Sequence, residues 1–273
     1  MTADRFRPLV DALLPCVLAA GRIEMRHFAA GVEVTTKADT SPVTIADHEA
    51  EEALLAGLAQ AAPGVPVIAE EAVAAGRIPA TREAFFLVDP LDGTRAFIKQ
   101  SPEFTINIGL VEHGVPVFGI IYAPAMQLLF ATLAPDRAVE VAIAPDFPGA
   151  GLADCQLKPL RTRAPEPNSL VAFASRSHAA ASTDAFLGRL PIPVTEKRRA
   201  SSSIKFCYIA RGEADLYARL GATSEWDTAA GHAILAAAGG SVTTAEGEPL
   251  RYGKAAERFA NPYFVAWARE PLL

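Results

Sequence analysis

Carboxylates stand at three points of the sequence where an apolar run ends or a helical pattern begins. Glu70 and Glu71 close the stretch PVIAEE, and Asp89 and Asp92 belong to DPLDGT, directly after the apolar EAFFLV. Asp227 begins the helical pattern of DTAAGHAILAAAGG. Carboxylate oxygens are the ligands that Mg²⁺ prefers, and this ion keeps positions open for water and substrate phosphate. If the three points meet in the fold, they predict a magnesium-dependent site that acts on a phosphate group.

The other residues of DPLDGT add groups that suit the same chemistry. Pro90 restricts the backbone, so that a carbonyl such as that of Leu91 can face inward as a further oxygen ligand. Gly93 lets the chain approach a ligand closely. Its N–H and that of Thr94 would cradle a phosphate if a helix begins there. We therefore expect a sharp turn after the strand, with both aspartates of the motif in the turn.

Each acidic group also has an ordinary structural interpretation. A pair such as Glu70 and Glu71 is typically solvated, and an Asp-Gly pair such as that at Asp92 typically forms a turn. Asp227 alone is most simply a helix N-cap, worth about 1 kcal/mol to its helix. Both interpretations stay open at this level, because the sequence does not show whether these groups converge in space.

The composition excludes other classes of protein. The chain has 273 residues, is 51% hydrophobic and carries a formal net charge of −6 without a basic block, so a nucleic-acid partner is not expected. Its three cysteines lie far apart without a CxxC pair, which predicts free thiols in a reducing compartment. No apolar run reaches the roughly 18 residues of a membrane span. We expect a cytoplasmic protein, free or loosely associated with the inner membrane.

The hydrophobic pattern predicts the elements that must position the acidic groups. We expect helices over residues 3–30, 43–62, 179–190, 202–211 and 227–238. We expect strands within 31–42 and over 66–71, 83–88, 104–110, 115–122, 126–133, 170–174 and 214–219, with one or two more after Gly240. Strands and helices mix without strict alternation, which favours layered sheets and helices. The Pro- and Gly-rich stretch 136–167 predicts two parts, 1–155 and 156–273, the first with most of the acidic groups.

Taken together, EE, DPLDGT and WDTAAGH resemble the signature of the inositol monophosphatase superfamily, the lithium-sensitive Mg²⁺-dependent phosphatases. Within it the chain is most similar to the bacterial 3'(2'),5'-bisphosphate nucleotidase group, which removes the 3'-phosphate of adenosine 3',5'-bisphosphate (PAP) in sulfate assimilation. The stretches that carry this likeness are KADTSPVTIAD (37–47), FIKQSPEFTINIGLVEHGVPVFGIIYAP (97–124), SRSH (175–178) and SSIKFCYIARGEADLYARLG (202–221). The resemblance covers nearly the whole chain from about residue 30.

The resemblance implies an α+β fold, a layered α/β/α/β/α sandwich of the inositol monophosphatase and fructose-1,6-bisphosphatase type. It also implies two or three Mg²⁺ ions per site. Their ligands would be Glu70, Asp89, the Leu91 carbonyl, Asp92 and Asp227. Asp47 would orient the hydroxyl of Thr94, and Thr94 and Glu70 would help to activate a metal-bound water.

On the substrate side, the resemblance implies contacts from Gly93, Thr94, His178, Ser202, Lys205 and Arg219. Lys205 and Arg219 would supply positive charge to a second phosphate. Each also has an ordinary interpretation, Lys205 as a solvated helix residue, Arg219 as a cation at a strand end and His178 as a local cap. The chain departs from the group near this site, because Ser201 stands where glycine is frequent and Ala180 where aspartate is frequent.

We therefore expect a Mg²⁺-dependent phosphoric monoester hydrolase that converts PAP to AMP, with PAPS as a further substrate. One alternative is an inositol-1-phosphate, histidinol-phosphate or other sugar- or polyol-phosphate phosphatase on the same scaffold. The other is a non-catalytic protein that senses nucleotide or metal, against which the complete set of family ligands argues. The expected partner is a small phosphorylated molecule, the expected state is a monomer or homodimer, and lithium should inhibit.

Overall fold

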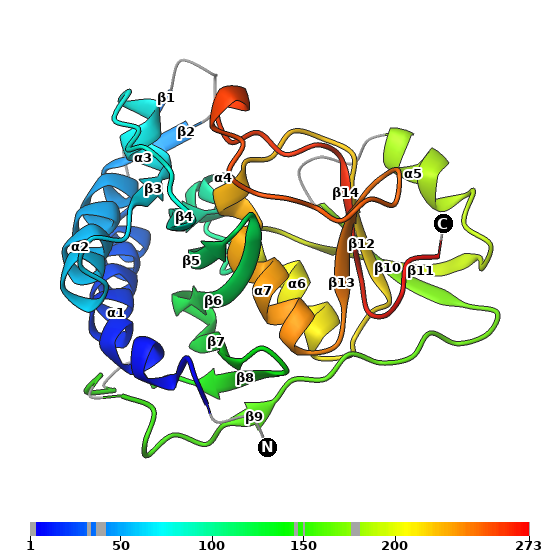
Figure 1. The fold of residues 1–273 in the computed structure, drawn as a ribbon, viewed down its shortest axis with the longest axis horizontal. Helices are drawn as coiled ribbons and strands as arrows, with labels where there is room; N and C mark the ends of the chain where they lie inside the picture. The colour runs from blue at the N-terminus through cyan, green and yellow to red at the C-terminus, as the bar shows by residue number, and fades with distance from the viewer. Residues whose placement is uncertain are drawn as a thin grey trace.

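The fold is a stack of five layers, visible from left to right in Figure 1. Helices α1 (Arg7–Ala30) and α2 (Ile45–Ala61) form one outer layer, and α5 (Ala181–Leu187) forms the other. Helices α6 (Ile204–Ala210) and α7 (Ala229–Ala237) lie between two sheets. This computed structural model describes residues 4–31, 34–36, 42–144, 147–149, 151–175 and 181–272. The arrangement confirms the α/β/α/β/α sandwich that the sequence predicts.

The larger sheet has seven strands in the order β3-β4-β5-β6-β7-β8-β9, and all neighbours are antiparallel except β3 and β4. Its strands are β3 (Val67–Ala69), β4 (Ala84–Asp92), β5 (Thr105–Glu112), β6 (Val115–Ala123), β7 (Leu128–Ala134), β8 (Arg137–Ala142) and β9 (Lys158–Pro159). The predicted pairing around EHG is confirmed, because β5 and β6 form a hairpin. His113 and Gly114 both have positive φ, 51° and 75°, as a tight two-residue hairpin turn requires.

The smaller sheet has five strands in the order β11-β10-β12-β14-β13. They are β10 (Leu170–Ser175), β11 (Val194–Ala200), β12 (Leu216–Arg219), β13 (Ser241–Thr244) and β14 (Phe264–Trp267). β10 runs parallel to both β11 and β12, whereas β14 lies antiparallel between β12 and β13. The strand that comes latest in the chain therefore occupies an interior position of this sheet.

A pair of glycines sets the distance between α7 and the larger sheet. Gly109 on β5 and Gly119 on β6 lie opposite each other. A Cβ at Gly109 would lie 2.7 Å from the Cβ of Ala229, and a Cβ at Gly119 would lie 2.2 Å from the carbonyl oxygen of Ala230. The first turn of α7 is thus seated directly on the backbone of two strands. Because that turn follows Asp227, the glycine pair fixes where this aspartate stands.

One apolar core joins the two sheets across the α6–α7 layer. It includes Phe130 from the larger sheet, Phe206 from α6 and Tyr217 from the smaller sheet, all buried. A second core lies between the larger sheet and the α1–α2 layer. The two-part division at residue 155 stays a prediction, since the sheets share a core and β9 completes the larger sheet just beyond that point.

Short elements complete the fold. β1 (Val34–Thr36) pairs with β2 (Pro42–Thr44), and the remaining helices are α3 (Glu70–Ala74), α4 (Thr94–Ile98), η1 (Pro124–Met126), η2 (Glu225–Asp227) and η3 (Ala255–Glu257). The sequence pattern missed β8, β9 and β11. β11, VTEKRRA, lies at a sheet edge, where charged side chains replace the apolar signal of an interior strand. Within the described ranges, no helix combines the length and apolarity needed to cross a bilayer.

Candidate active site

Three carboxylates from distant parts of the sequence meet in one place. Glu70, Asp89 and Asp227 each offer an oxygen atom, and these atoms all lie within 4.8 Å of one another. Glu70 is the first residue of α3, Asp89 lies on β4 and Asp227 ends η2. The structure therefore brings together one acidic group from each of the three points that the sequence singled out.

Glu70 is positioned by the junction between β3 and α3. β3 runs parallel to β4, which brings the end of β3 beside the Asp89 strand. Glu51 of α2 is buried, and its carboxylate accepts a hydrogen bond from the amide of Glu71 at 2.8 Å. That bond satisfies an N–H group at the start of α3 that has no partner within the helix. Burial raises the pKa of the Glu51 carboxyl.

The DPLDGT motif differs locally from the turn that we predicted. β4 continues through Asp92, with an irregular register between Asp89, which pairs with Asn107, and Asp92, which pairs with Thr105. Pro90 has no N–H to donate to the ladder, and the amide of Leu91 instead donates to the Asp89 carboxylate at 3.0 Å. The two aspartates therefore stand on either side of a bulge within the strand, rather than in a turn after it.

Gly93 and Thr94 follow the bulge and begin α4, as the sequence predicts. Gly93 has a φ of 95°, and a Cβ there would lie 3.1 Å from the carbonyl oxygen of Glu103. The hydroxyl oxygen of Thr94 lies 3.3 Å from Oδ1 of Asp47 and 3.2 Å from the carbonyl oxygen of Leu91. Its single hydrogen can be donated to one of these acceptors at a time.

Asp47 is held in place by the N-terminal cap of α2. Its Oδ2 accepts from the amide of Thr44 at 2.8 Å and from the hydroxyl of Thr44 at 2.7 Å, in a capping box. Its side chain is buried. One carboxylate oxygen is thus fixed by the helix start, and the other is left to face Thr94, which is the contact that the resemblance implied.

Asp92 lies beside the three-carboxylate cluster, and its carboxylate is held by hydrogen bonds from Ser203 and Asn107. Its Oδ2 accepts from the amide of Ser203 at 2.5 Å and from the side-chain amide of Asn107 at 3.4 Å. Burial raises the pKa of Asp92, and the nearby charge of Lys205 acts against that rise. Asp92 and Asp227 line the same hollow of about 240 Å³.

Asp227 is held by a capping box of its own. Asp227 is the third residue of η2, and its Oδ2 accepts a hydrogen bond at 2.8 Å from the amide of Ser224, the N-cap residue. We expected Asp227 to open the long helix, but α7 begins two residues later, after Thr228. Burial, together with the charges of Asp92 and Glu70, raises the pKa of Asp227 to about 8. A carboxyl group in such surroundings calls for a compensating positive charge.

Two buried cations stand next to the carboxylates. Nζ of Lys205 donates to the carbonyl of Ser202 and lies 4.8 Å from the ring centroid of Tyr217, and burial lowers the pKa of Lys205 to about 8. Arg219 donates to the carbonyl of Ala222 at 2.8 Å, and its buried Nε has no partner among the described residues. Both cations, with Ser202, line a small hollow of about 70 Å³ that also contacts Asp92 and Asp227. Lys205 is therefore not the solvated helix residue of the ordinary interpretation.

Several of the expected positions lie outside the described residues. These are His178 and Ala180, together with residues 37–41 of the stretch KADTSPVTIAD, which carries part of the family likeness. The other residues that we expected around the substrate, Gly93, Thr94, Ser202 and Arg219, line the 240 Å³ hollow together with the acidic groups. Ser201 also lines it, and the amide of Ser201 donates to the Glu103 carboxylate at 2.9 Å.

A polar network beneath Asp92 was missed by the sequence reasoning. The hydroxyl of Ser203 bonds to the side-chain oxygen of Asn107 at 2.7 Å and to the hydroxyl of Thr105 at 2.8 Å. Thr105, Asn107 and Ser203 are all buried. A signal for the network was present, because Asn107 is the one amide side chain within the apolar strand TINIGLV. Buried polar side chains need hydrogen-bond partners, so this network indicates that the position of Asp92 is specifically supported.

The donor set fits a hard divalent cation. Carboxylate oxygens of Glu70, Asp89 and Asp227 converge, and the two nearby cations stand on the side of Asp92. Burial and the charges of Asp92 and Glu70 raise the pKa of Asp227, so negative charge is unfavourable at this place. A cation bound among the carboxylates would compensate that negative charge, and oxygen is the ligand atom that such ions prefer.

Comparison with known proteins agrees with this geometry. The model of the inositol monophosphatase family matches residues 7–270. The chain belongs to this family. It is 40% identical over 259 residues to the 3'(2'),5'-bisphosphate nucleotidase CysQ of Escherichia coli O157:H7, covering 94% of this chain and 98% of that protein. It is 35% identical over 266 residues to the CysQ of Buchnera aphidicola, covering 96% of this chain and 95% of that protein.

Solved structures of the family share the fold. The crystal structure of CysQ from Bacteroides thetaiotaomicron, a bacterial member of the inositol monophosphatase family, matches with a TM-score of 0.77 and 35% identity, covering 97% of this chain and 99% of that chain. The inositol monophosphatase TM1415 of Thermotoga maritima matches with a TM-score of 0.70 at 22% identity, covering 93% of this chain and 90% of that chain. The family and the layered fold expected from the sequence motifs are therefore confirmed.

Proposed function

We propose that this protein is a Mg²⁺-dependent 3'(2'),5'-bisphosphate nucleotidase that hydrolyses the 3'-phosphate of PAP to give AMP, with PAPS as a further substrate. The observation that carries the proposal is the position of two buried cations, Lys205 and Arg219, beside the converging carboxylates of the metal-type cluster. A substrate with a second phosphate needs positive charge at that place, whereas a simple monophosphate does not. The name of the relatives at 35–40% identity supports the same conclusion.

The metal ligands in this proposal are Glu70, Asp89 and Asp227, joined by Asp92 and by the carbonyl of Leu91. Two or three Mg²⁺ ions, when bound, would supply Lewis acidity and lower the pKa of a water molecule. The side chains do the rest of the positioning. Asp47 holds the Thr94 hydroxyl in one orientation, so that its oxygen can accept a hydrogen bond from the attacking water. The Glu70 carboxylate, which lines the same hollow, can accept the proton.

The substrate residues are proposed on the other side of the cluster. The phosphate that is cleaved would lie against Gly93 and Thr94 at the start of α4. Arg219 would bind the second phosphate through its guanidinium group, and Lys205 and Ser202 line the same hollow. His178 belongs to the same proposal through the family resemblance alone.

A substrate panel tests the function. Phosphate release should be measured with PAP, adenosine 2',5'-bisphosphate, inositol-1-phosphate, fructose-1,6-bisphosphate and histidinol phosphate, each with Mg²⁺, with EDTA and with Li⁺ added to Mg²⁺. We expect the highest kcat/KM for PAP, no release in EDTA and inhibition by Li⁺. A preference for inositol-1-phosphate or histidinol phosphate would retain the carboxylate site and overturn the nucleotide assignment.

The cellular setting also remains a proposal. Cys16, Cys155 and Cys207 are all unpaired, which supports a reducing compartment such as the cytoplasm. Whether the chain acts as a monomer or as a homodimer stays a prediction, to be decided by measuring its mass in solution. A small phosphorylated molecule is the partner that the site supports.

A further inference from the structure

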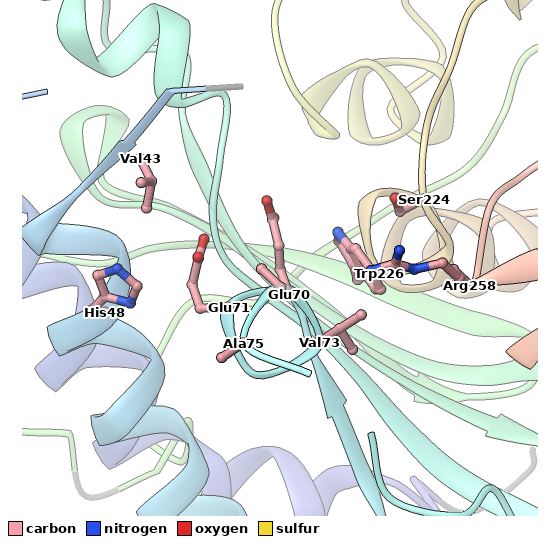
Figure 2. Close-up of a pocket in the computed structure, with 10 residues that line it drawn as sticks. Val43, His48, Glu70, Glu71, Val73, Ala75, Ser224, Trp226 and Arg258 are labelled. Atoms are coloured by element: carbon pink, nitrogen blue, oxygen red, sulfur yellow. The ribbon is translucent and has the colours of Figure 1, made fainter. Parts of the chain in front are cut away.

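A larger compartment adjoins the carboxylate cluster at Glu70. It has a volume of about 710 Å³, and Glu70 lines both this compartment and the hollow next to Arg219. Figure 2 shows His48 on one side of it, Trp226 and Arg258 on the other, and Glu70 between them. The proposed reaction uses the Lys205–Arg219 side, so this compartment is not required by it. Its volume lies within the range of sites for small organic ligands.

Two basic side chains face the compartment without a partner in the described part of the chain. The exposed side chains of His48 and Arg258 line it, and neither makes a hydrogen bond or ion pair with any residue that the structure describes. Lys254, which is close to Arg258 in sequence, behaves differently, because its Nζ lies 2.6 Å from the carboxylate of Glu225. Arg258 is therefore free to bind an anion, and its planar guanidinium suits a phosphate.

The walls also suit a flat ring. Trp226 lines the compartment with 8% of its surface exposed, and it packs on Phe259 with ring centroids 6.2 Å apart. Val43 and Val73 add apolar surface. On the Trp226 side, the indole N–H, the Ser224 hydroxyl and the Arg258 guanidinium are hydrogen-bond donors. A ligand that fits these walls has an aromatic ring and an acceptor-rich anionic group.

The backbone that carries Arg258 is held in an uncommon conformation. Arg258 and Phe259 have φ values of 52° and 60°, which residues other than glycine rarely adopt. Such a conformation persists only where the surroundings fix it. Here the amide of Glu225 donates to the carbonyl of Phe259 at 2.8 Å.

The side chain of Glu225 makes further hydrogen bonds to the segment that carries Arg258. Its fully buried carboxylate accepts from the amides of Gly253 at 2.7 Å and Lys254 at 2.9 Å. Glu225 directly precedes Trp226 and lies two residues before Asp227. The segment with Arg258 is therefore fixed to the loop that supplies both the aromatic wall and a carboxylate of the cluster.

We propose that this compartment is a second ligand site that binds a mononucleotide, with its base against Trp226 and its phosphate on Arg258. The site lies beside the Lys205–Arg219 hollow and is occupied independently of it. Because Glu70 lines this compartment and is also a carboxylate of the cluster, a nucleotide bound here changes the affinity of the cluster for a cation, and the cation changes the affinity for the nucleotide by the same factor. AMP is chosen as the probe because it is the product of the proposed function, and only that choice rests on it.

The protein contains a built-in reporter for this site. It has two tryptophans, Trp226 in the compartment and Trp267 on β14, where the indole is buried and donates to Thr243 at 3.1 Å. In a Trp267→Phe variant, Trp226 is the only source of indole fluorescence. AMP should be titrated in EDTA, without metal, so that the measurement does not depend on turnover. We expect a saturable change in the fluorescence of Trp226.

Three further substitutions in that background decide where AMP binds. Arg258→Gln should weaken binding at least tenfold, and Arg251→Gln is the matched control, because Arg251 is exposed near the same segment and does not line the compartment. AMP keeps the phosphate that the proposed function places on Arg219, so Arg219→Gln removes any binding phase at that hollow and should leave the Kd of the Arg258-dependent phase unchanged. Loss of binding in Arg219→Gln with full binding in Arg258→Gln would overturn the proposal, since AMP would then occupy the other hollow.

The ligand class is tested separately. Inorganic phosphate should compete with AMP only at much higher concentration, because it lacks the ring. Equal affinity for inorganic phosphate, or no binding of AMP, would refute the mononucleotide site. If Trp267→Phe does not fold, calorimetric titration of AMP into the unmodified chain and into Arg258→Gln measures the same difference in affinity. Hydrolysis of the substrate panel can fail while AMP still binds, so the two proposals fail separately.

Discussion

Replacement of Gly119 by alanine tests whether the close packing of α7 on β5 and β6 sets the geometry of the carboxylate cluster. The added Cβ would lie 2.2 Å from the carbonyl oxygen of Ala230 and 2.9 Å from its Cα. Both atoms belong to the backbone, so no side-chain rotation relieves the overlap. Gly119 does not have a positive φ, so alanine is acceptable to the strand itself and the effect comes from the contact alone.

The size of the effect follows from the overlap. Ordinary contact begins at about 3.4 Å, so α7 must retreat by roughly 1 Å at Ala230. Overpacking of this kind costs about 1–3 kcal/mol of unfolding free energy. Asp227 lies three residues before Ala230 and moves with the helix. A displacement of about 1 Å at a catalytic group lowers the rate by on the order of 100-fold. We expect about 2 kcal/mol of lost stability and a 10- to 100-fold lower kcat/KM for PAP, by those two estimates together.

Urea denaturation and phosphate release at a series of Mg²⁺ concentrations measure the two effects. Gly188→Ala is the matched control, because the nearest atom to its added Cβ is 3.4 Å away, and it should change neither quantity. A Gly119→Ala variant that loses stability but keeps its Mg²⁺ dependence and its kcat/KM would show that the seat of α7 does not set the position of Asp227.

Other substitutions test the site and its supports. Asp227→Asn should lower kcat by orders of magnitude and, in EDTA at pH 8.5, raise the melting temperature, because burial and the charge of Asp92 disfavour the ionised carboxylate, which forms only above a pKa of about 8. The increase in melting temperature produced by Mg²⁺ should be larger at pH 8.5 than at pH 6.5. Burial raises the pKa of Asp227 to about 8, so protons compete with the metal below that pH. Asp215→Ala should cost about 3 kcal/mol in urea denaturation, because it leaves Arg163 and the amide of Val171 without an acceptor. Burial lowers the pKa of His232 to about 3, so its imidazole is neutral in the fold and gains a proton on unfolding below pH 6.5. Stability should therefore fall as the pH falls below about 6.5, by up to about 1.4 kcal/mol per pH unit, and His232→Gln should flatten this slope in denaturation curves from pH 5 to 8.

The acidic groups of the site could be predicted because each stands where the local pattern changes. Glu70 follows a short apolar strand, Asp89 follows the apolar run FFLV and Asp227 precedes an Ala-rich helix, so these changes of pattern are visible in the sequence. Their convergence was not visible. It depends on the parallel pairing of β3 with β4 and on the packing of α7 on β5 and β6. The second contact joins residues more than a hundred positions apart, such as Gly119 and Ala230.

The errors have local physical causes. The turn expected at DPLDGT is a bulge within β4, because Thr105 pairs with Asp92 and resumes the ladder beyond Pro90. Lys205 is not among these errors, because it was expected to face a phosphate, and its ordinary interpretation as a solvated residue fails since α6 lies between the two sheets and buries it. The support of Asp92 by Ser203 could not be found from spacing, since the two residues come from different layers of the fold.

The order of strands in the smaller sheet has a consequence for the synthesis of the protein. β14 lies between β12 and β13, although the ribosome makes both of those strands first. Until Phe264–Trp267 has emerged, β12 has no partner on that edge, and Phe264 is the residue that pairs with Arg219. A nascent chain that has already produced every carboxylate of the cluster therefore still exposes an open sheet edge, which invites pairing with other chains. A chain that lacks β14 should therefore be a target for proteolysis rather than a weakened phosphatase.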